Sequence, residues 1–322
     1  AWPPRLPNGM LFEGLKGDEV VDSWTIYSVG GGALANEASR LETPRSIYPL
    51  STISEIKEWC YHEGKTFWEY VSDCEGPEIW DYLDTVWETM CATIQRGLNN
   101  DGVLPGGLKV ARKASTYWVK SKSYTDSLSS RAKIYAYALA TSEENASGGT
   151  VVTAPTCGSS GVMPAVLYHL STSRNFLRIR ILRALATAGL FGNVAKTNSS
   201  ISGAEVGCQG EVGVACAMAA AAACQLFGGT PSQIEYAAEM GLEHHLGLTC
   251  DPVCGLVQVP CIERNAIAAA RAFDANAYAT LSDGSHMVSF DKVVEVMNET
   301  GHALPSLYRE TSEGGLAKRF KR

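Results

Sequence analysis

An alanine-rich apolar run over residues 212–227 constrains the fold of this chain more than any other feature. The run is shorter than the roughly 20 apolar residues that a membrane-spanning helix needs. Seven of its 16 residues are alanine, whose side chain is a single methyl group. Small side chains permit close packing between helices. We therefore expect a buried helix over residues 209–227 in a soluble, mostly α-helical protein.

Apolar residues recur at helical spacing through most of the chain after about residue 51. The pattern is clearest over residues 77–98, where a Pro-Glu pair opens it and Gly97 closes it. Further helical stretches are expected over residues 54–60, 126–140, 163–170, 177–190, 231–246 and 262–279. Glycine-rich segments separate these stretches, and strand patterns are few. The sequence predicts a helical domain with glycine-rich loops between buried helices.

The N-terminal part has a different pattern. Residues 23–29 alternate as a β-strand does and run into Gly30-Gly31-Gly32. Three glycines can cradle a phosphate, but no Lys-Ser/Thr follows them, so a turn that ends the strand is the better interpretation. A lone strand needs a sheet to join, so we interpret it as the last strand of a domain whose earlier part is absent or shortened.

Charge and cysteine usage exclude some classes of protein. The net charge of −7 gives no electrostatic support for binding nucleic acid. The basic residues 318–322 are few, and we interpret them as a solvated tail. The first residues lack the basic and apolar parts of a signal peptide. The 10 cysteines are too scattered for a disulfide scaffold. We expect a cytoplasmic protein with buried free thiols and a metal site, and no membrane partner.

Three cysteines on separate segments are the candidates for that site. Cys208 directly precedes a predicted helix, Cys250 lies just past another, and Cys261 follows Pro260 at the start of a third. Backbone N–H groups and the helix dipole would stabilise a thiolate at Cys208. Three thiolates can hold a metal cluster and leave one metal position open for chemistry.

The spacing of these cysteines is not diagnostic by itself. Free cysteine is among the most buried residue types, so each of the three can also be read as a small core residue. Four other cysteines fall on predicted helices and fit that interpretation well: Cys60, Cys91, Cys216 and Cys224.

The segments around the three cysteines resemble the iron–sulfur L-serine dehydratases. The likeness covers about residues 50–317, and residues 10–40 look like the end of that family's smaller α+β domain, called β in two-subunit members. We accordingly divide the chain into the end of an α+β domain over residues 1–45 and a helical catalytic domain over residues 46–322. The matching motifs lie in residues 153–156, 196–213, 246–253, 255–266 and 309–317.

The resemblance implies that Cys208, Cys250 and Cys261 hold a 4Fe–4S cluster whose fourth iron has no protein ligand. That iron would take the hydroxyl of L-serine and act as a Lewis acid as the hydroxyl leaves. A base would remove the Cα proton, and the resulting aminoacrylate would give pyruvate and ammonia. The family likeness thus implies a lyase of amino-acid catabolism and gluconeogenesis, acting as a homo-oligomer (dimer) or with a partner β-type domain.

Polar loops near the predicted cluster supply candidates for binding serine, whose carboxylate needs several N–H or hydroxyl donors. These candidates also fit a purely structural role as helix caps and turn residues. They are Thr153, Thr156, Ser159, Asn198, Ser200 and Ser202. The catalytic base is not assigned by the sequence, and the candidates for it are His244, His245 and Lys196.

The sequence departs from the family pattern in three places. The Ser-Ser-His-Thr motif of the smaller domain does not occur, so we expect that part of that domain is missing. Cys254 replaces a small residue and is read either as a tolerated substitution or as a competing ligand. No cysteine follows the Gly-Gly-Leu-Ala motif at residues 314–317, so we expect no cysteine tail to occupy the open iron.

Three other functions remain open at this point. An L-cysteine desulfidase would use the same cluster to eliminate sulfide. A pyridoxal phosphate dehydratase would need an active lysine, for which Lys196 is the candidate beside the glycine-rich loops. A non-catalytic structural subunit would close a zinc site with Cys254 as the fourth ligand beside the three matching cysteines.

Overall fold

The computed structural model describes residues 9–28, 34–36 and 47–320. The chain separates into two compact units, Ala1–Ile47 and Tyr48–Arg322, which are considered individually. The Gly30-Gly31-Gly32 turn expected from the sequence lies outside the described residues.

The N-terminal unit contains a three-stranded antiparallel sheet. Its strands are β1 (Gly9–Lys16), β2 (Glu19–Ser28) and β3 (Leu34–Asn36), in the order β1-β2-β3. Gly17 takes a positive φ of 66°, which lets the chain reverse tightly between β1 and β2. The strand expected at residues 23–28 is present and joins a sheet, but it is not the last strand: these residues belong to the central strand β2, which pairs with β1 and with β3. Strand β1 was not predicted, because its glycines interrupt the alternation of apolar and polar residues.

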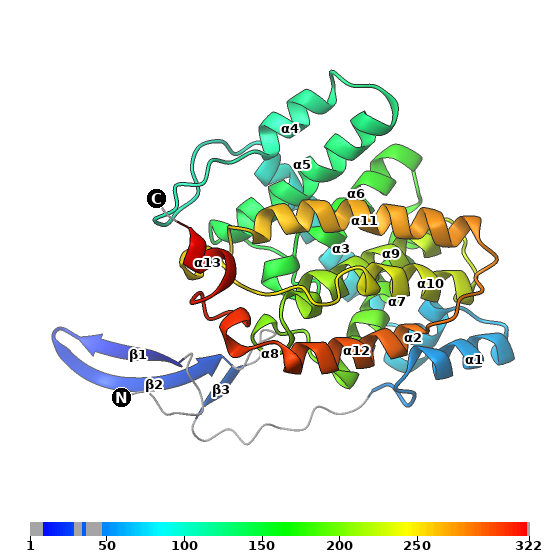
Figure 1. Cartoon of the computed structure of the whole chain (residues 1–322), viewed down its shortest axis with the longest axis horizontal. Helices are drawn as coiled ribbons and strands as arrows, with labels where there is room; N and C mark the ends of the chain where they lie inside the picture. The colour runs from blue at the N-terminus through cyan, green and yellow to red at the C-terminus, as the bar shows by residue number, and fades with distance from the viewer. Residues whose placement is uncertain (1–8, 29–33, 37–46, 321–322) are drawn as a thin grey trace. The chain divides into compact units, whose positions relative to one another are not determined.

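The second unit is helical and confirms the predicted mostly α-helical fold (Figure 1). Its helices are α1 (Ile53–Glu63), α2 (Phe67–Glu75), α3 (Ile79–Leu98), α4 (Ala114–Ser121), α5 (Asp126–Ala146), α6 (Val162–Arg174), α7 (Arg178–Asn198), α8 (Gly203–Val206), α9 (Val214–Leu226), α10 (Pro231–Glu243), α11 (Cys261–Leu281), α12 (Phe290–Ala303) and α13 (Gly315–Arg319). In the described part of the chain, none of these helices combines the length and the apolar character needed to cross a bilayer.

Helix α9 forms the centre of this unit, where it packs against α6, α7, α10 and α11 (Figure 1). All of its side chains except Gln225 are buried. The alanines let neighbouring helices approach closely: a Cβ added to Gly241 of α10 would lie 2.9 Å from the Cα of Ala217. The alanine-rich run is therefore a core helix, as its composition predicts.

Helix boundaries differ from the sequence patterns in both directions. Helix α7 continues to Asn198, past the expected end at 190, and α5 continues to Ala146, past 140. No glycine–proline signal stops either helix. The last turns of α5 are stabilised by the hydrogen bonds that buried Glu143 accepts from the backbone N–H groups of Lys113 and Ala114 and by the ion pairs of buried Glu144. The expected helix over 209–227 begins as a π-helix, Gln209–Gly213, and becomes α-helical at Val214.

Candidate functional site

The π-helix Gln209–Gly213 places a cysteine and a carboxylate at one end of the core helix. It directly follows Cys208 and carries Glu211 in its middle. Glycines shape this turn: Gly207 has a φ of 76°, and a Cβ on it would lie 2.7 Å from the backbone oxygen of Leu248. π-Turns are rare in proteins and are frequent at functional sites.

Cys250 is fixed by the C-terminal segment of the chain. Its backbone N–H donates to the Tyr308 oxygen at 2.8 Å, and its backbone oxygen accepts from the N–H of Glu310 at 2.6 Å. The next residue, Asp251, accepts a hydrogen bond from the N–H of Leu316 at 2.5 Å. Residues 308–316 therefore hold the Cys250 loop in two ways. Arg309 forms an isolated parallel β-bridge with Cys250, and the start of α13 binds Asp251.

Cys261 is the first residue of α11 and is tied to the loop before α6 through Asn265. The Asn265 side-chain amide donates to the backbone oxygens of Cys261 at 2.9 Å and Gly158 at 2.8 Å. Its Oδ1 accepts from the N–H of Gly161 at 2.9 Å. One buried amide thus fixes the Cys261 turn and the loop at residues 157–161 together.

The three thiols are buried and interact with one another. Cys208, Cys250 and Cys261 are 2%, 4% and 8% exposed. A hydrogen bond from Cys250, together with the positive charge of Arg264, lowers the pKa of Cys208 to about 7, and the same bond raises the pKa of Cys250. Burial and then the charge of Cys208 raise the pKa of Cys261 to about 12. The fold therefore gathers one easily ionised thiol and two partners from three segments.

Sequence reasoning missed Glu211, which lies among these cysteines. Its Oε1 accepts a hydrogen bond from Thr156 Oγ1 at 2.8 Å, and its Oε2 lies 3.9 Å from Cys250 Sγ. Burial, followed by the charge of Cys208, raises the pKa of Glu211 to about 8. A Cβ on Gly203 would lie 2.7 Å from Oε2 of Glu211. The available signal was an acidic residue between glycines, three positions after Cys208.

The predicted serine-binding residues separate into two groups. Thr156 and Ser159 are buried, and their hydroxyl oxygens lie 3.1 Å apart beside Glu211. Ser202 is buried and precedes Gly203, and its N–H donates to Ser200 Oγ at 3.0 Å.

The other two candidates, Thr153 and Asn198, are exposed. Asn198 lies at the end of α7, and its side chain donates to the backbone oxygen of Ser51 at 2.7 Å.

The three candidate bases are not hydrogen-bonded to a cysteine in the described part of the chain. Lys196 is exposed on α7. His244 is exposed, and its Nδ1 lies 2.9 Å from the Met240 oxygen and 2.7 Å from a carboxylate oxygen of Glu243. His245 is buried, donates to the Gly241 oxygen at 2.7 Å, and has its pKa lowered to about 4 by burial.

A cavity of about 460 Å³ opens beside the cysteine site. Its lining includes His245, Arg264 and Pro260, the residue before Cys261. The Arg264 guanidinium donates to the Thr249 oxygen at 2.6 Å and lies 3.6 Å from Asp251. An arginine held in this way can still present its remaining N–H groups to an anionic group in the cavity.

Three thiols on separate segments are the type of ligand that holds iron–sulfur clusters. Over residues 9–28, 34–36 and 47–320, no three His, Cys, Asp or Glu side chains are arranged around one metal position. A 4Fe–4S cluster instead spreads its thiolate ligands over separate irons. Cys254 is exposed and has a φ of 57°, outside the buried group of three, which argues against the closed zinc site.

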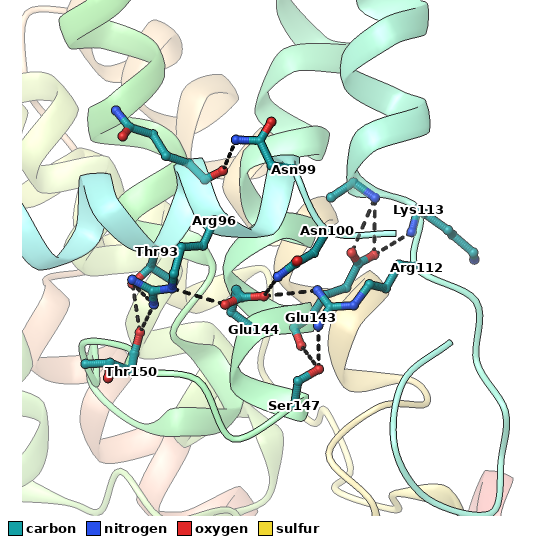
Figure 2. A network of polar contacts seen from close by, with 12 residues as sticks. Thr93, Arg96, Asn99, Asn100, Arg112, Lys113, Glu143, Glu144, Ser147 and Thr150 are labelled. Carbon is teal, nitrogen blue, oxygen red and sulfur yellow. Dashed lines mark hydrogen bonds and ion pairs between the residues drawn. The ribbon is translucent and has the colours of Figure 1, made fainter. Parts of the chain in front are cut away.

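Two adjacent glutamates of α5 fix the loops that flank the site (Figure 2). Glu144 accepts hydrogen bonds from Asn100 at 2.7 Å, Arg112 at 3.1 Å and Arg96 at 3.2 Å. Glu143 caps the start of α4 by accepting from the backbone N–H of Lys113 at 2.7 Å. Both carboxylates are buried, so their partners are needed to offset the loss of hydration.

This network reaches the site along two routes. Arg96 also donates to the Thr150 oxygen at 2.7 Å, which fixes the segment that leads to Thr156 (Figure 2). On the other side, the loop between Asn100 and Arg112 presents the Pro105 oxygen to the side-chain amide of Gln258 at 2.8 Å. Gln258 lies three residues before Cys261. The paired glutamates therefore help to fix the segment that leads to Thr156 and the segment that leads to Cys261.

Known proteins with similar sequences point in one direction. The family model described as serine dehydratase alpha chain matches residues 31–317. L-serine dehydratase 1 of Escherichia coli K12 is 46% identical, with 98% of this chain and 72% of the relative covered. L-serine dehydratase of Streptomyces coelicolor is also 46% identical at the same coverage. L-serine dehydratase of Helicobacter pylori is 39% identical over 98% of this chain and 73% of its own length.

Proposed function

Because the chain belongs to the serine dehydratase alpha chain family, we propose that it is an L-serine ammonia-lyase. The reaction eliminates water from L-serine, and the resulting aminoacrylate gives pyruvate and ammonia. The observation that carries the proposal is the gathering of three buried, mutually interacting thiols beside the Glu211 carboxylate.

The thiols of Cys208, Cys250 and Cys261 would hold the 4Fe–4S cluster. When bound, a cluster with one iron free of protein ligands supplies a Lewis acid for the departing hydroxyl. The lowered pKa of Cys208 supports thiolate ligation, because the thiolate is the form of cysteine that binds metal.

The residues of the chain would bind the substrate and move its proton. Arg264 lines the 460 Å³ cavity and is suited to pair with the serine carboxylate. Glu211, which accepts a hydrogen bond from Thr156, would accept the Cα proton. We favour Glu211 over His244, His245 and Lys196 because, of these four in the described structure, it is the one that contacts a cysteine. Thr156, Ser159, Ser200 and Ser202 would supply hydroxyl donors.

Two alternative functions receive less support. The relatives at 39–46% identity are named for L-serine, which does not favour an L-cysteine desulfidase. The exposed position of Cys254 does not favour a structural zinc subunit.

The wider setting follows from the same family likeness. We propose a cytoplasmic enzyme of amino-acid catabolism that feeds gluconeogenesis, working as a dimer or with a β-type partner domain, of which residues 1–45 would be the end. All 10 cysteines are free, which suits a reducing compartment.

An anaerobic metal analysis tests the proposal. Reconstituted protein should contain about four iron and four acid-labile sulfide per chain and show a broad absorption band near 400 nm. It should then form pyruvate from L-serine faster than from L-cysteine. A colourless protein that binds one zinc, or turnover of cysteine alone, would contradict it.

A further inference from the structure

One cavity of the helical unit lies apart from the three cysteines. Its volume is about 790 Å³, within the range of small-molecule sites. It is formed by α10, α11 and the segment 285–288. No cysteine lines it, so the proposed dehydration leaves this cavity without a role.

One acidic side chain in this cavity is buried and has no partner. Glu239 is 6% exposed, and no side-chain or backbone donor among the described residues contacts its carboxylate. A buried carboxylate without a partner is costly, because it has lost hydration and gained nothing in exchange. Glu239 therefore has unused capacity to bind a cation.

The other charged groups of the cavity are already engaged. Glu243 lies 2.7 Å from His244, and Asp274 lies 3.2 Å from Arg131. Arg271 donates to the backbone oxygen of His244 at 2.7 Å. Glu239 thus differs from its neighbours in having no counter-charge within the fold.

Aromatic rings form the wall next to Glu239. The Tyr236 ring stacks on His286 with centroids 4.5 Å apart and an interplanar angle of 4°. Tyr278 meets Tyr236 edge-on at 6.0 Å. Aromatic faces attract cations through the ring quadrupole, and a desolvated site strengthens this attraction. A carboxylate beside tyrosine rings is the chemistry that recognises an alkylammonium group.

We infer that the cavity between α10 and α11 binds a small molecule that carries a primary ammonium group, with Glu239 as its counter-ion and Tyr236 and Tyr278 as its aromatic wall. This site is separate from the three cysteines and adjoins the smaller cavity beside Arg264, because His244 and Arg271 line both. Because the site is separate from the three cysteines, binding of a ligand in the cavity can be measured without measuring enzymatic turnover.

Direct binding with a matched pair of probes tests this inference. The full chain is titrated at about pH 8 with n-butylamine, which is charged there, and with n-butanol, which has the same length and no charge. Binding is followed by saturation-transfer NMR on the probe. We expect saturation transfer to n-butylamine and at least a tenfold weaker response to n-butanol. Equal responses to both probes would overturn the inference.

Two charge variants locate the site. Glu239→Gln keeps the shape of the side chain and should weaken n-butylamine binding at least tenfold. Glu295→Gln makes the same change in net charge on the exposed face of α12, outside the cavity, and should leave binding within twofold. Thermal melts show whether each variant is folded. Unchanged binding in a folded Glu239→Gln variant would overturn the inference.

A second copy of the chain is the competing occupant, since Met287 lines the cavity and is fully exposed. Sedimentation of the wild type and of Met287→Glu distinguishes the two. If the wild type is a dimer that Met287→Glu separates, and n-butylamine binds only the separated form, the cavity is an interface and the inference fails. Equal binding to both forms supports it.

Discussion

The carboxylate of Glu211 lies 3.9 Å from the thiol of Cys250, although 38 residues separate the two in sequence. The π-turn after Cys208 brings Glu211 to this position, and the Thr156 hydroxyl holds its other oxygen. A carboxylate is thereby fixed next to the group of thiols. The proposed elimination needs a base and the ligands of a cluster, and the Glu211 carboxylate and the thiols that would serve in these roles lie side by side.

Replacing Glu211 tests its role in proton transfer. Glu211→Gln keeps the hydrogen bond from Thr156 but cannot accept a proton, so kcat for pyruvate formation should fall about 10²- to 10⁴-fold. Iron content, measured on the same sample, should stay unchanged. Glu205→Gln, an exposed residue of the neighbouring helix α8, is the matched control and should keep wild-type kcat. A Glu211→Gln variant with full activity would contradict the assignment.

Serine substitutions separate ligand cysteines from other cysteines. Changing Cys208, Cys250 or Cys261 to serine should remove most of the iron and the absorption near 400 nm, because the hydroxyl is a poor ligand for this cluster. Cys254→Ser should retain both, since Cys254 is exposed and lies outside the buried group. Loss of iron from Cys254→Ser would instead favour a four-cysteine site.

A single methyl group at Gly203 should disrupt the site. The added Cβ would lie 2.7 Å from Glu211 Oε2 and 3.0 Å from Cys250 Sγ, so one of the two must move. We expect Gly203→Ala to lower kcat at least tenfold and to reduce iron content. At Gly189 in α7, nothing lies within 4 Å of an added Cβ. Gly189→Ala should leave kcat unchanged and raise stability by about 0.5–1 kcal/mol.

The buried network of Figure 2 should matter more for stability than a surface ion pair does. Glu144→Ala leaves Arg112, whose side chain is 9% exposed, without its counter-charge. The free energy of unfolding should fall by about 3–5 kcal/mol, measured by urea denaturation. Glu88→Ala breaks an exposed pair with Arg178 and should cost less than about 1 kcal/mol. Similar losses of unfolding free energy in both variants would show that the buried network stabilises the fold no more than a surface ion pair does.

The buried carboxyl of Glu239 should make stability depend on pH. Burial, together with the negative charges of Glu243 and Glu235, raises its pKa from 4.5 to about 7. Arg271 and Asp274 of α11 and His286 also line this cavity. Because the pKa of Glu239 is higher in the folded state, its protonation contributes to the free energy of unfolding. This contribution is fully present below about pH 4.5 and is lost as the pH rises to about 7.

A comparison of wild type with Glu239→Gln measures that contribution, since glutamine does not titrate. Relative to wild type, the variant should gain on the order of 1–3 kcal/mol of unfolding free energy between pH 5 and pH 8. Parallel curves for the two proteins over this range would contradict the prediction.

Local sequence patterns were sufficient for the helices of the core. The alanine-rich composition predicts the buried helix α9, and the apolar spacing over residues 77–98 predicts α3. Helix ends were less predictable, because the last turns of α5 depend on ion pairs with Arg96 and Arg112, which are distant in sequence. The π-turn at 209–213 arises from contacts of Gly207 and Gly210 with other loops, which no periodicity reveals.

The site residues also divide into those that local motifs predict and those that depend on tertiary contacts. The motifs around Cys208, Cys250 and Cys261 singled these residues out, but the position of Glu211 depends on how three loops meet. Asn198 shows the reverse case: it lies in a motif of polar residues, yet its side chain hydrogen-bonds to Ser51. Sequence identifies which residue types are present near a site, and tertiary packing decides which of them reach it.

The hold of residues 308–316 on the Cys250 loop has a consequence for biosynthesis. This segment follows all three cysteines in the chain, so it emerges from the ribosome after them. While it is still in the exit tunnel, Cys250 lacks its backbone hydrogen bonds to the Tyr308 oxygen and from the Glu310 N–H. The nascent chain therefore displays its thiols before their final geometry exists, and the proposed cluster would assemble only after translation has passed this segment.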